Sequence, residues 1–302
     1  MTYTEREGEV EIADIGDFVP ELIFECGQCF RWDADADGGY VGVAMGQVAR
    51  VRRGQGGGQG GGQGSGQGSS QGGGQSGGQD AIFISGTADE FEATWRGYFD
   101  MDRDYGEIRR HLCIGDFMRR ATGFGAGIRI LRQDAWEALC SFIVSQCNNI
   151  PRIKKIISTL CRHFGDAVTF EDKEYHTFPS ASRLASLDEA DLAPLRCGYR
   201  AAFIIGAARD VDSGKIDLEA LKNLTPADAR SELKKLRGVG NKVADCTALF
   251  GLHMLDAFPL DVWMKRAIAE CFPKGFDPAV FSPYAGIAQQ YIFHHVRTLP
   301  HQ

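Results

Sequence analysis

The sequence has no apolar run long enough to cross a bilayer, since no window holds 18 consecutive apolar residues. Its first twelve residues, MTYTEREGEVEI, lack the apolar core of a secretory signal. The nine cysteines are odd in number and lack the spacing of a disulfide framework. We therefore expect no membrane segment and no export signal, and reduced thiols in a reducing compartment.

Clustered metal ligands are also missing. The one C-x-x-C pair, Cys26 and Cys29, has no second pair to complete a zinc site, and it falls in a segment of strand character. The carboxyl terminus has no group of four cysteines for an iron–sulfur cluster. We expect no metal site.

Positive charge is scarce overall, because 33 Lys and Arg face 40 Asp and Glu and the net charge is −7. This balance disfavours a nucleic-acid partner in general. Between Arg103 and Arg162, however, eleven basic residues face five acidic ones, enough for a basic face on an acidic molecule. The alternative is a set of solvated helix faces, and charge alone does not separate the two.

Residues 54–79 contain only Gly, Gln and Ser, which bury no apolar surface to offset the entropy of ordering. We expect them to form a disordered hairpin loop without a function. Before about residue 100, short β-prone segments are separated by Gly and Asp turns. These segments are 10–15, 30–32, 40–44, 47–51 and 81–84.

After Asp104 the apolar residues recur at helical spacing, as at Trp136, Leu139, Cys140 and Ile143. The same spacing returns at 153–160, 233–236, 243–250 and 262–268. At 302 residues, the chain is long enough for two domains. We predict the α+β class, with a small antiparallel β-rich domain at 1–103 and a larger all-helical region at 104–302.

The stretch 225–250, TPADARSELKKLRGVGNKVADCTALF, predicts two helices joined by a glycine turn. Thr225-Pro226 marks the start of the first helix, which we expect to reach Leu236. Gly238-Val239-Gly240 makes the turn, and we expect Asn241 to cap the second helix. The exposed N–H groups of such a turn suit the phosphates of a DNA backbone. Taken alone, the motif also fits a plain helix–helix connection.

Lys242 lies in the first turn of the second helix, where the helix dipole disfavours a positive charge. A lysine that loses its proton easily is a nucleophile for carbon centres and forms Schiff bases. Asp261 follows Pro259-Leu260 and opens the next helix, where an aspartate is most often only an N-cap. Lys242 and Asp261 at successive helix starts can also converge on one cleft. There the carboxylate would stabilise positive charge on a sugar that is losing its base.

These residues carry a resemblance to a known family. RGVGNKVADCTALF and AFPLDVWMKRAI look like the helix-hairpin-helix DNA glycosylases, and specifically the 8-oxoguanine DNA glycosylase/lyases. Further blocks resemble that family in the same order along nearly the whole chain. They are CGQCFRW (26–32), SFIVSQCNNIPRI (141–153), FPS (178–180), CGYRAAFI (197–204) and PYAGIAQQYIF (283–293).

The resemblance implies an active site in a cleft between the domains and a double-stranded DNA partner containing 8-oxoguanine. It implies that Lys242 attacks C1′ of the flipped-out nucleotide with the help of Asp261, and that β-elimination then nicks the strand. No cofactor is needed, because the lysine serves as the electron sink. The residues it assigns to base recognition are Gly27, Cys246, Gln289 and Phe293. Those it assigns to DNA binding are Asn148, Asn149, Arg152, Tyr199, Arg200, Gly238, Val239 and Gly240.

Two departures from the family stand out. Cys147 occupies the place of a third asparagine, and Trp263 a place where several members have histidine. The alternatives are a glycosylase of the same superfamily for another damaged base, which Lys242 disfavours, and a non-catalytic DNA-docking module. We expect a monomer, in the cytoplasm at the nucleoid of a bacterium or in the nucleus of a eukaryote.

Overall fold

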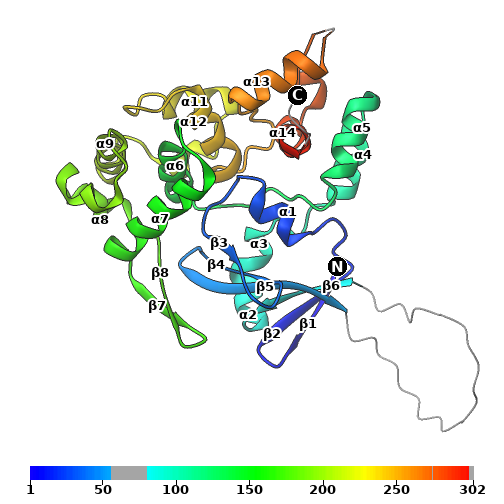
Figure 1. The fold of residues 1–302 in the computed structure, drawn as a ribbon, viewed down its shortest axis with the longest axis horizontal. Helices are drawn as coiled ribbons and strands as arrows, with labels where there is room; N and C mark the ends of the chain where they lie inside the picture. The colour runs from blue at the N-terminus through cyan, green and yellow to red at the C-terminus, as the bar shows by residue number, and fades with distance from the viewer. Residues whose placement is uncertain (56–79, 274, 299–302) are drawn as a thin grey trace, which may run out of the picture.

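The computed structural model describes residues 1–55, 80–273 and 275–298, with a sheet at one end of the molecule and helices at the other (Figure 1). The sheet has six antiparallel strands in the order β1-β2-β6-β5-β4-β3. Their bounds are β1 Thr2–Arg6, β2 Glu9–Ala13, β3 Trp32–Ala34, β4 Tyr40–Ala44, β5 Gln47–Gln55 and β6 Asp80–Ser85. The predicted α+β class is confirmed.

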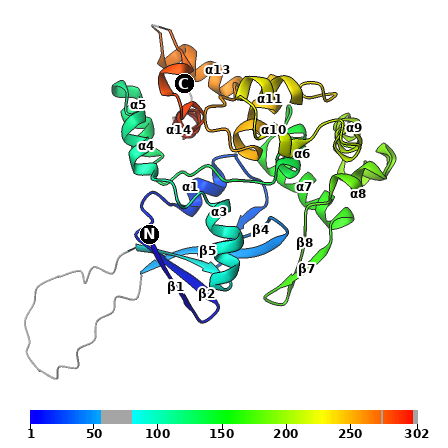
Figure 2. The ribbon, with the colours of Figure 1, turned by 180° about the vertical axis from the view of Figure 1, so that it is seen from behind.

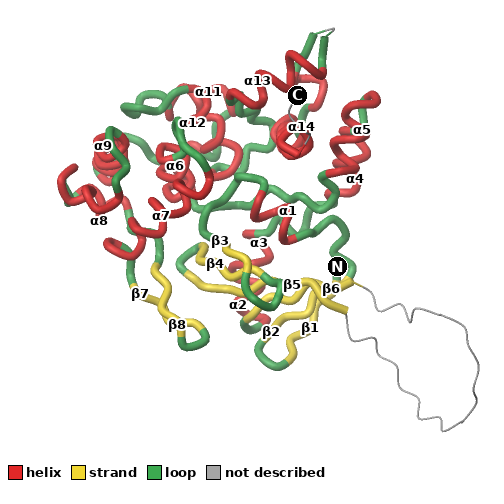
Figure 3. Tube along the Cα trace, viewed as in Figure 1, coloured by secondary structure: helices red, strands yellow, loops and turns green. Residues whose placement is uncertain are grey.

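Most of the helices lie above the sheet in the view of Figure 3, where helices are red and strands yellow. In the larger part they are α4 Tyr105–Leu112, α5 Gly115–Phe124, α6 Ala135–Val144, α7 Ile150–Phe164, α8 Ala181–Ala185, α9 Arg200–Asp212, α10 Leu218–Leu221, α11 Pro226–Leu233, α12 Asn241–Cys246, α13 Val262–Cys271 and α14 Ala285–Thr298. Among the residues that the structure describes, no helix is long and apolar enough to span a membrane.

The amino-terminal part is less purely β than the sequence predicts. Helix α1, Pro20–Glu25, follows β2, and a helical segment runs from α2, Ala88–Glu90, through a π-helical turn to α3, Arg96–Tyr98. Seen from behind, α3 lies over one face of the sheet (Figure 2). The Cys26–Cys29 segment is a loop after α1 and not a strand.

The prediction of an all-helical second part is wrong at one place. Strands β7, Ala167–Phe170, and β8, Lys173–His176, form a two-stranded antiparallel hairpin between α7 and α8. The side chains of this hairpin are exposed or half-buried, so its sequence carries little of the apolar alternation that marks a strand against a core.

Two apolar cores form, and most residues of each lie on one side of the predicted division, although Cys26 and Phe30 join the larger core and Leu131 the smaller one. The smaller core is rich in aromatic rings, with Trp32 stacked on Phe24 at 4.3 Å between ring centroids. The larger core unites the inner faces of α6, α7, α9, α12 and α14. We propose a domain boundary near residue 103, which this separation of the cores supports.

Buried polar groups join the two parts. Gln28 is 1% exposed; its amide Nε2 donates to the carbonyl of Arg129 at 2.8 Å, and its Oε1 accepts from the Leu131 N–H at 2.9 Å. Asp100 accepts from Arg132 at 2.7 Å and lies 3.3 Å from Nε2 of His253. Each residue thus fixes the amino-terminal part against segments far along the chain.

The Gly/Gln/Ser segment gives a prediction about stability. Strand β5 extends to Gln55, four residues beyond the predicted strand end, and Gln55 is the register partner of Asp80. The expected disordered loop therefore narrows to residues 56–79, which lie outside the described residues. Because closure entropy grows only with the logarithm of length, shortening these 24 residues to eight should raise the free energy of unfolding by about 1 kcal/mol. Urea unfolding measures this change. Any large loss of DNA processing in the shortened variant would show that the segment has a function.

Candidate active site

A cavity of about 620 Å³ lies where the amino-terminal part meets the helices. This volume is ordinary for a small-molecule site. Its walls come from the loop after α1, the end of α6 with the loop into α7, the hairpin turn with α12, the start of α13, and α14. Residues from these walls include Gly27, Phe142, Ser145, Asn148, Asn149, Gly240, Lys242, Asp261, Trp263, Phe293 and Arg297.

The hairpin has the predicted form, with two differences at its helix ends. Helix α11 ends at Leu233, three residues before the predicted end, and Gly240 rather than Asn241 is the N-cap of α12. No side chain caps α12, so the N–H groups of its first turn lack a side-chain acceptor. Gly238 has φ +84°, and an added Cβ would lie 2.3 Å from the ring of Phe203, so only glycine fits there.

Lys242 and Asp261 line the same cavity. The half-buried Lys242 donates from Nζ to Oγ of Ser145 at 2.8 Å, and Nζ lies 4.9 Å from the centroid of the Phe142 ring. Asp261 is the N-cap of α13, and its Oδ1 accepts from the Met264 N–H at 2.8 Å. Asp261 therefore does cap α13, but the cap uses only one of its two carboxylate oxygens.

Gly27 reaches the cavity because its neighbours hold the loop in place. It has φ +85°, a left-handed conformation that favours glycine, and an added Cβ would lie 3.6 Å from the ring of Phe293. The next residue, Gln28, anchors the loop through its amide and through its own carbonyl, which accepts from Gln133 at 2.7 Å. The loop thus presents its backbone to the cavity from a fixed position.

The other predicted base-recognition residues differ in exposure to the cavity. Phe293 lines it, with the Arg297 guanidinium 5.3 Å from its ring centroid. Gln289 and Cys246 are each 4% exposed and are not among the lining residues. Gln289 accepts from the side chain of Gln290 at 2.9 Å. Burial raises the pKa of the Cys246 thiol to about 11, so this side chain is neutral near pH 7.

The predicted DNA-binding residues near α7 and α9 divide into exposed and buried groups. Asn148 and Asn149 line the cavity, and Asn149 caps α7 by accepting from the Arg152 N–H at 3.0 Å. Tyr199 is 54% exposed, and Arg152 is exposed as well, with one donor directed to the carbonyl of Arg196 at 3.3 Å.

Arg200 is buried, and its guanidinium donates to backbone carbonyls of the protein itself. The acceptors are Gln146 at 3.1 Å from Nε, Cys197 at 3.2 Å and Cys147 at 3.3 Å. Cys147, which the sequence marks as a departure from the family, is exposed and has φ +47°. In this structure Arg200 therefore holds the turn that carries Cys147 beside the cavity.

Ser145 and Phe142 were not predicted as site residues, although both lie in the block SFIVSQCNNIPRI. The apolar spacing assigns Phe142 to a core helix and gives no sign of a role at the site. Ser145 directly follows the last residue of that helix, where the spacing predicts nothing. Trp263 is 38% exposed and lines the cavity beside Asp261, so this second departure from the family also faces the site.

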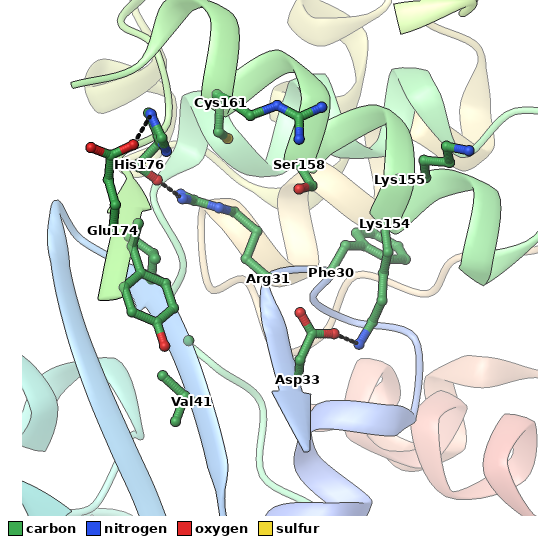
Figure 4. Close-up of a pocket in the computed structure, with 14 residues that line it drawn as sticks. Phe30, Arg31, Asp33, Val41, Lys154, Lys155, Ser158, Cys161, Glu174 and His176 are labelled. Carbon is green, nitrogen blue, oxygen red and sulfur yellow. Dashed lines mark hydrogen bonds and ion pairs between the residues drawn. The ribbon is translucent and has the colours of Figure 1, made fainter. Parts of the chain in front are cut away.

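A second cavity, of about 510 Å³, lies between β3, β4, α7 and β8. Figure 4 shows Lys154 reaching Asp33, at 2.8 Å, and the Arg31 side chain directed to the backbone of His176. Arg31 also pairs with Glu137 at 3.2 Å. These charges are matched within the protein and join the sheet to the helical part, so we assign the cavity no ligand.

Comparison with known proteins identifies the family. Residues 12–139 match the model described as the 8-oxoguanine DNA glycosylase N-terminal domain, and residues 140–275 match the HhH-GPD superfamily of base excision DNA repair proteins. The solved DNA complex of a protein named MBOgg1 is 38% identical, with a TM-score of 0.85, over 98% of this chain and 99% of that one. This chain belongs to the 8-oxoguanine DNA glycosylase family.

Other members of the 8-oxoguanine DNA glycosylase family agree over most of the chain. The 8-oxoguanine glycosylase/lyase of Clostridium acetobutylicum is 33% identical in its complex with double-stranded DNA, with a TM-score of 0.85 and 98% of each chain covered. The N-glycosylase/DNA lyase of Saccharomyces cerevisiae is 37% identical over 193 residues, 60% of this chain and 51% of the yeast protein. The chain thus spans about half the length of this curated relative.

Proposed function

We propose that this protein flips 8-oxoguanine out of double-stranded DNA, excises it, and nicks the resulting abasic strand. The observation that carries the proposal is the meeting of Lys242, Asp261, Gly27 and Phe293 at one cavity. A nucleophile, a carboxylate, a backbone acceptor and an aromatic wall are the groups that excision of a flipped base requires. The uncapped first turn of α12 beside this cavity suits a DNA phosphate.

The proposed chemistry begins at C1′ of the flipped nucleotide. The amine of Lys242 forms a bond to C1′, the glycosidic bond breaks, and the base leaves with the bonding electron pair and takes up a proton. The carboxylate of Asp261 stabilises the positive charge that develops on the sugar. Opening of the sugar ring gives an imine. Loss of a proton from C2′ then expels the 3′ phosphate and nicks the strand.

Recognition of the lesion depends on N7, which carries a hydrogen in 8-oxoguanine and a lone pair in guanine. We assign the acceptor for this hydrogen to the carbonyl of Gly27, because its loop is fixed and borders the cavity. Normal guanine would leave two acceptors facing each other, which costs a buried hydrogen bond. Phe293 would cover one face of the base and Cys246 the other, and Gln289 would bind its Watson–Crick edge after releasing Gln290.

Duplexes that contain either 8-oxoguanine, an alkylated purine or no lesion test this function. We expect excision and strand nicking only with 8-oxoguanine, and a covalent enzyme–DNA adduct when borohydride reduces the imine. Excision of the alkylated purine without an adduct would instead identify a glycosylase for another lesion. Binding without any excision would identify a docking module.

The base opposite the lesion should affect the rate. We propose that Arg152 and Arg200 bind an orphan cytosine, whose O2 and N3 are acceptors, in preference to adenine, whose Watson–Crick edge carries an N6 donor. Arg152 is exposed, while Arg200 must first release carbonyls of the protein. One good bidentate contact is worth roughly 1–3 kcal/mol, so excision opposite cytosine should be about ten- to a hundredfold faster.

Single-turnover rates on the two duplexes measure this preference. Arg152→Ala should bring the two rates together with little effect on stability, because the side chain is exposed. Arg200→Ala should reduce both the preference and the stability, because it also removes the support of the Cys147 turn. Equal rates in the wild type would mean that both arginines serve only the protein backbone or DNA phosphates.

A further inference from the structure

Ser145 lies at the C-terminal end of α6, half-buried, on the wall of the cavity. Its Oγ is 2.8 Å from Nζ of Lys242 and 2.8 Å from the carbonyl oxygen of Phe142. Ser145 thus accepts a hydrogen bond from the nucleophilic nitrogen, which also lies close to the Cys246 thiol.

The direction of these two hydrogen bonds follows from the hydrogens available. A carbonyl oxygen has no hydrogen, so Ser145 donates its single hydroxyl hydrogen to Phe142. The hydroxyl oxygen can then only accept from Lys242 Nζ. A neutral amine that donates to Ser145 does not use its lone pair in that hydrogen bond. A hydroxyl free to donate would instead bind that lone pair and block attack on carbon.

Helix α6, which ends just before Ser145, is packed firmly in the core. All residues of α6 from Ala135 to Val144 except Glu137 are buried. The same helix end also supplies the buried Phe142 ring, whose centroid lies 4.9 Å from Nζ. A lysine side chain loses much rotamer freedom when it is ordered. Fixing Nζ before the DNA arrives removes that cost from the reaction itself.

We propose that Ser145 is a positioning residue, which orders Lys242 Nζ and leaves its lone pair available to C1′. This inference rests on the proposed role of Lys242 as nucleophile. Removal of the Ser145 hydroxyl should release Nζ from its position and slow its reaction with C1′.

The experiment compares Ser145→Ala with Ser141→Ala, a buried serine one turn earlier on α6 that does not line the cavity. The substrate is an abasic-site duplex, trapped with borohydride in single turnover. We expect Ser145→Ala to trap about tenfold more slowly than the wild type, with DNA affinity unchanged. Ser141→Ala should match the wild type, and Ser145→Thr, which keeps the hydroxyl, should recover most of the rate.

Two results would overturn the proposal. One is a wild-type trapping rate in Ser145→Ala. The other is an equal loss of rate in Ser145→Ala and Ser141→Ala, which would mean that α6 is merely destabilised. The abasic duplex separates this test from base recognition. A wild type that traps on abasic DNA but leaves 8-oxoguanine in place refutes the proposed substrate, whereas the comparison at Ser145 still stands.

Discussion

Lys242→Gln should bind an 8-oxoguanine duplex with nearly unchanged affinity and excise no base, a loss of at least about ten-thousandfold. Glutamine fills similar space and still donates a hydrogen bond toward Ser145, so the cavity keeps its shape. Its amide nitrogen is not nucleophilic, so neither imine formation nor strand nicking remains. Fluorescence anisotropy measures the affinity, and a single-turnover gel assay with borohydride measures excision and trapping.

Lys222→Gln is the matched control, because Lys222 follows α10, outside the cavity, and pairs with Glu219 at 2.7 Å. It loses the same charge at an exposed site and should excise at the wild-type rate. If Lys242→Gln retained excision but lost nicking, water rather than the lysine would be displacing the base. If it retained both, another nucleophile would have to be sought.

Asp261→Asn should reduce excision at least about a hundredfold while leaving the melting temperature nearly unchanged. Asparagine can accept from the Met264 N–H as the aspartate does, so α13 keeps its cap. The negative charge that opposes the developing positive charge on the sugar is lost, and one such electrostatic group is worth about a hundred- to a thousandfold in rate. Calorimetry and single-turnover excision separate the two effects.

Two further variants show whether the capping role accounts for the loss. Asp261→Ala should lower stability by about 1 kcal/mol as well as activity, since alanine cannot cap. Asp277→Asn, which changes a capping aspartate outside the cavity, should have little effect on either. Equal falls of stability and activity in Asp261→Asn would mean that Asp261 is only a helix cap.

The elements that the sequence predicted well are those with a long apolar stripe. Helices α6 and α7 follow the predicted spacing, and Gly238 of the hairpin turn has the positive φ that favours glycine. Helix α1 has only six residues, too few to show a period. In the 88–98 segment, a π-helical turn shifts the apolar positions, so their spacing no longer matches that of an α-helix.

Lys242 was identifiable because a lysine is unexpected at a helix start, and the family resemblance supplied the other predicted site residues. The contacts that support the site were not predicted. Gln28 and Arg200 act through backbone carbonyls that lie 101 and 54 residues away along the chain, at Arg129 and Gln146. No local pattern marks such partners, so only the folded chain shows that a buried glutamine fixes the Gly27 loop.

The buried links made by Gln28 and Asp100 have a consequence for the cell. Because each is satisfied by groups from both parts of the molecule, neither part can open without leaving polar atoms unpaired, and the two parts should melt in a single cooperative transition. A substitution that destabilises the sheet then destabilises the helical part as well. Destabilising substitutions in the sheet would lower the amount of folded protein in the cell without altering the chemistry of the site.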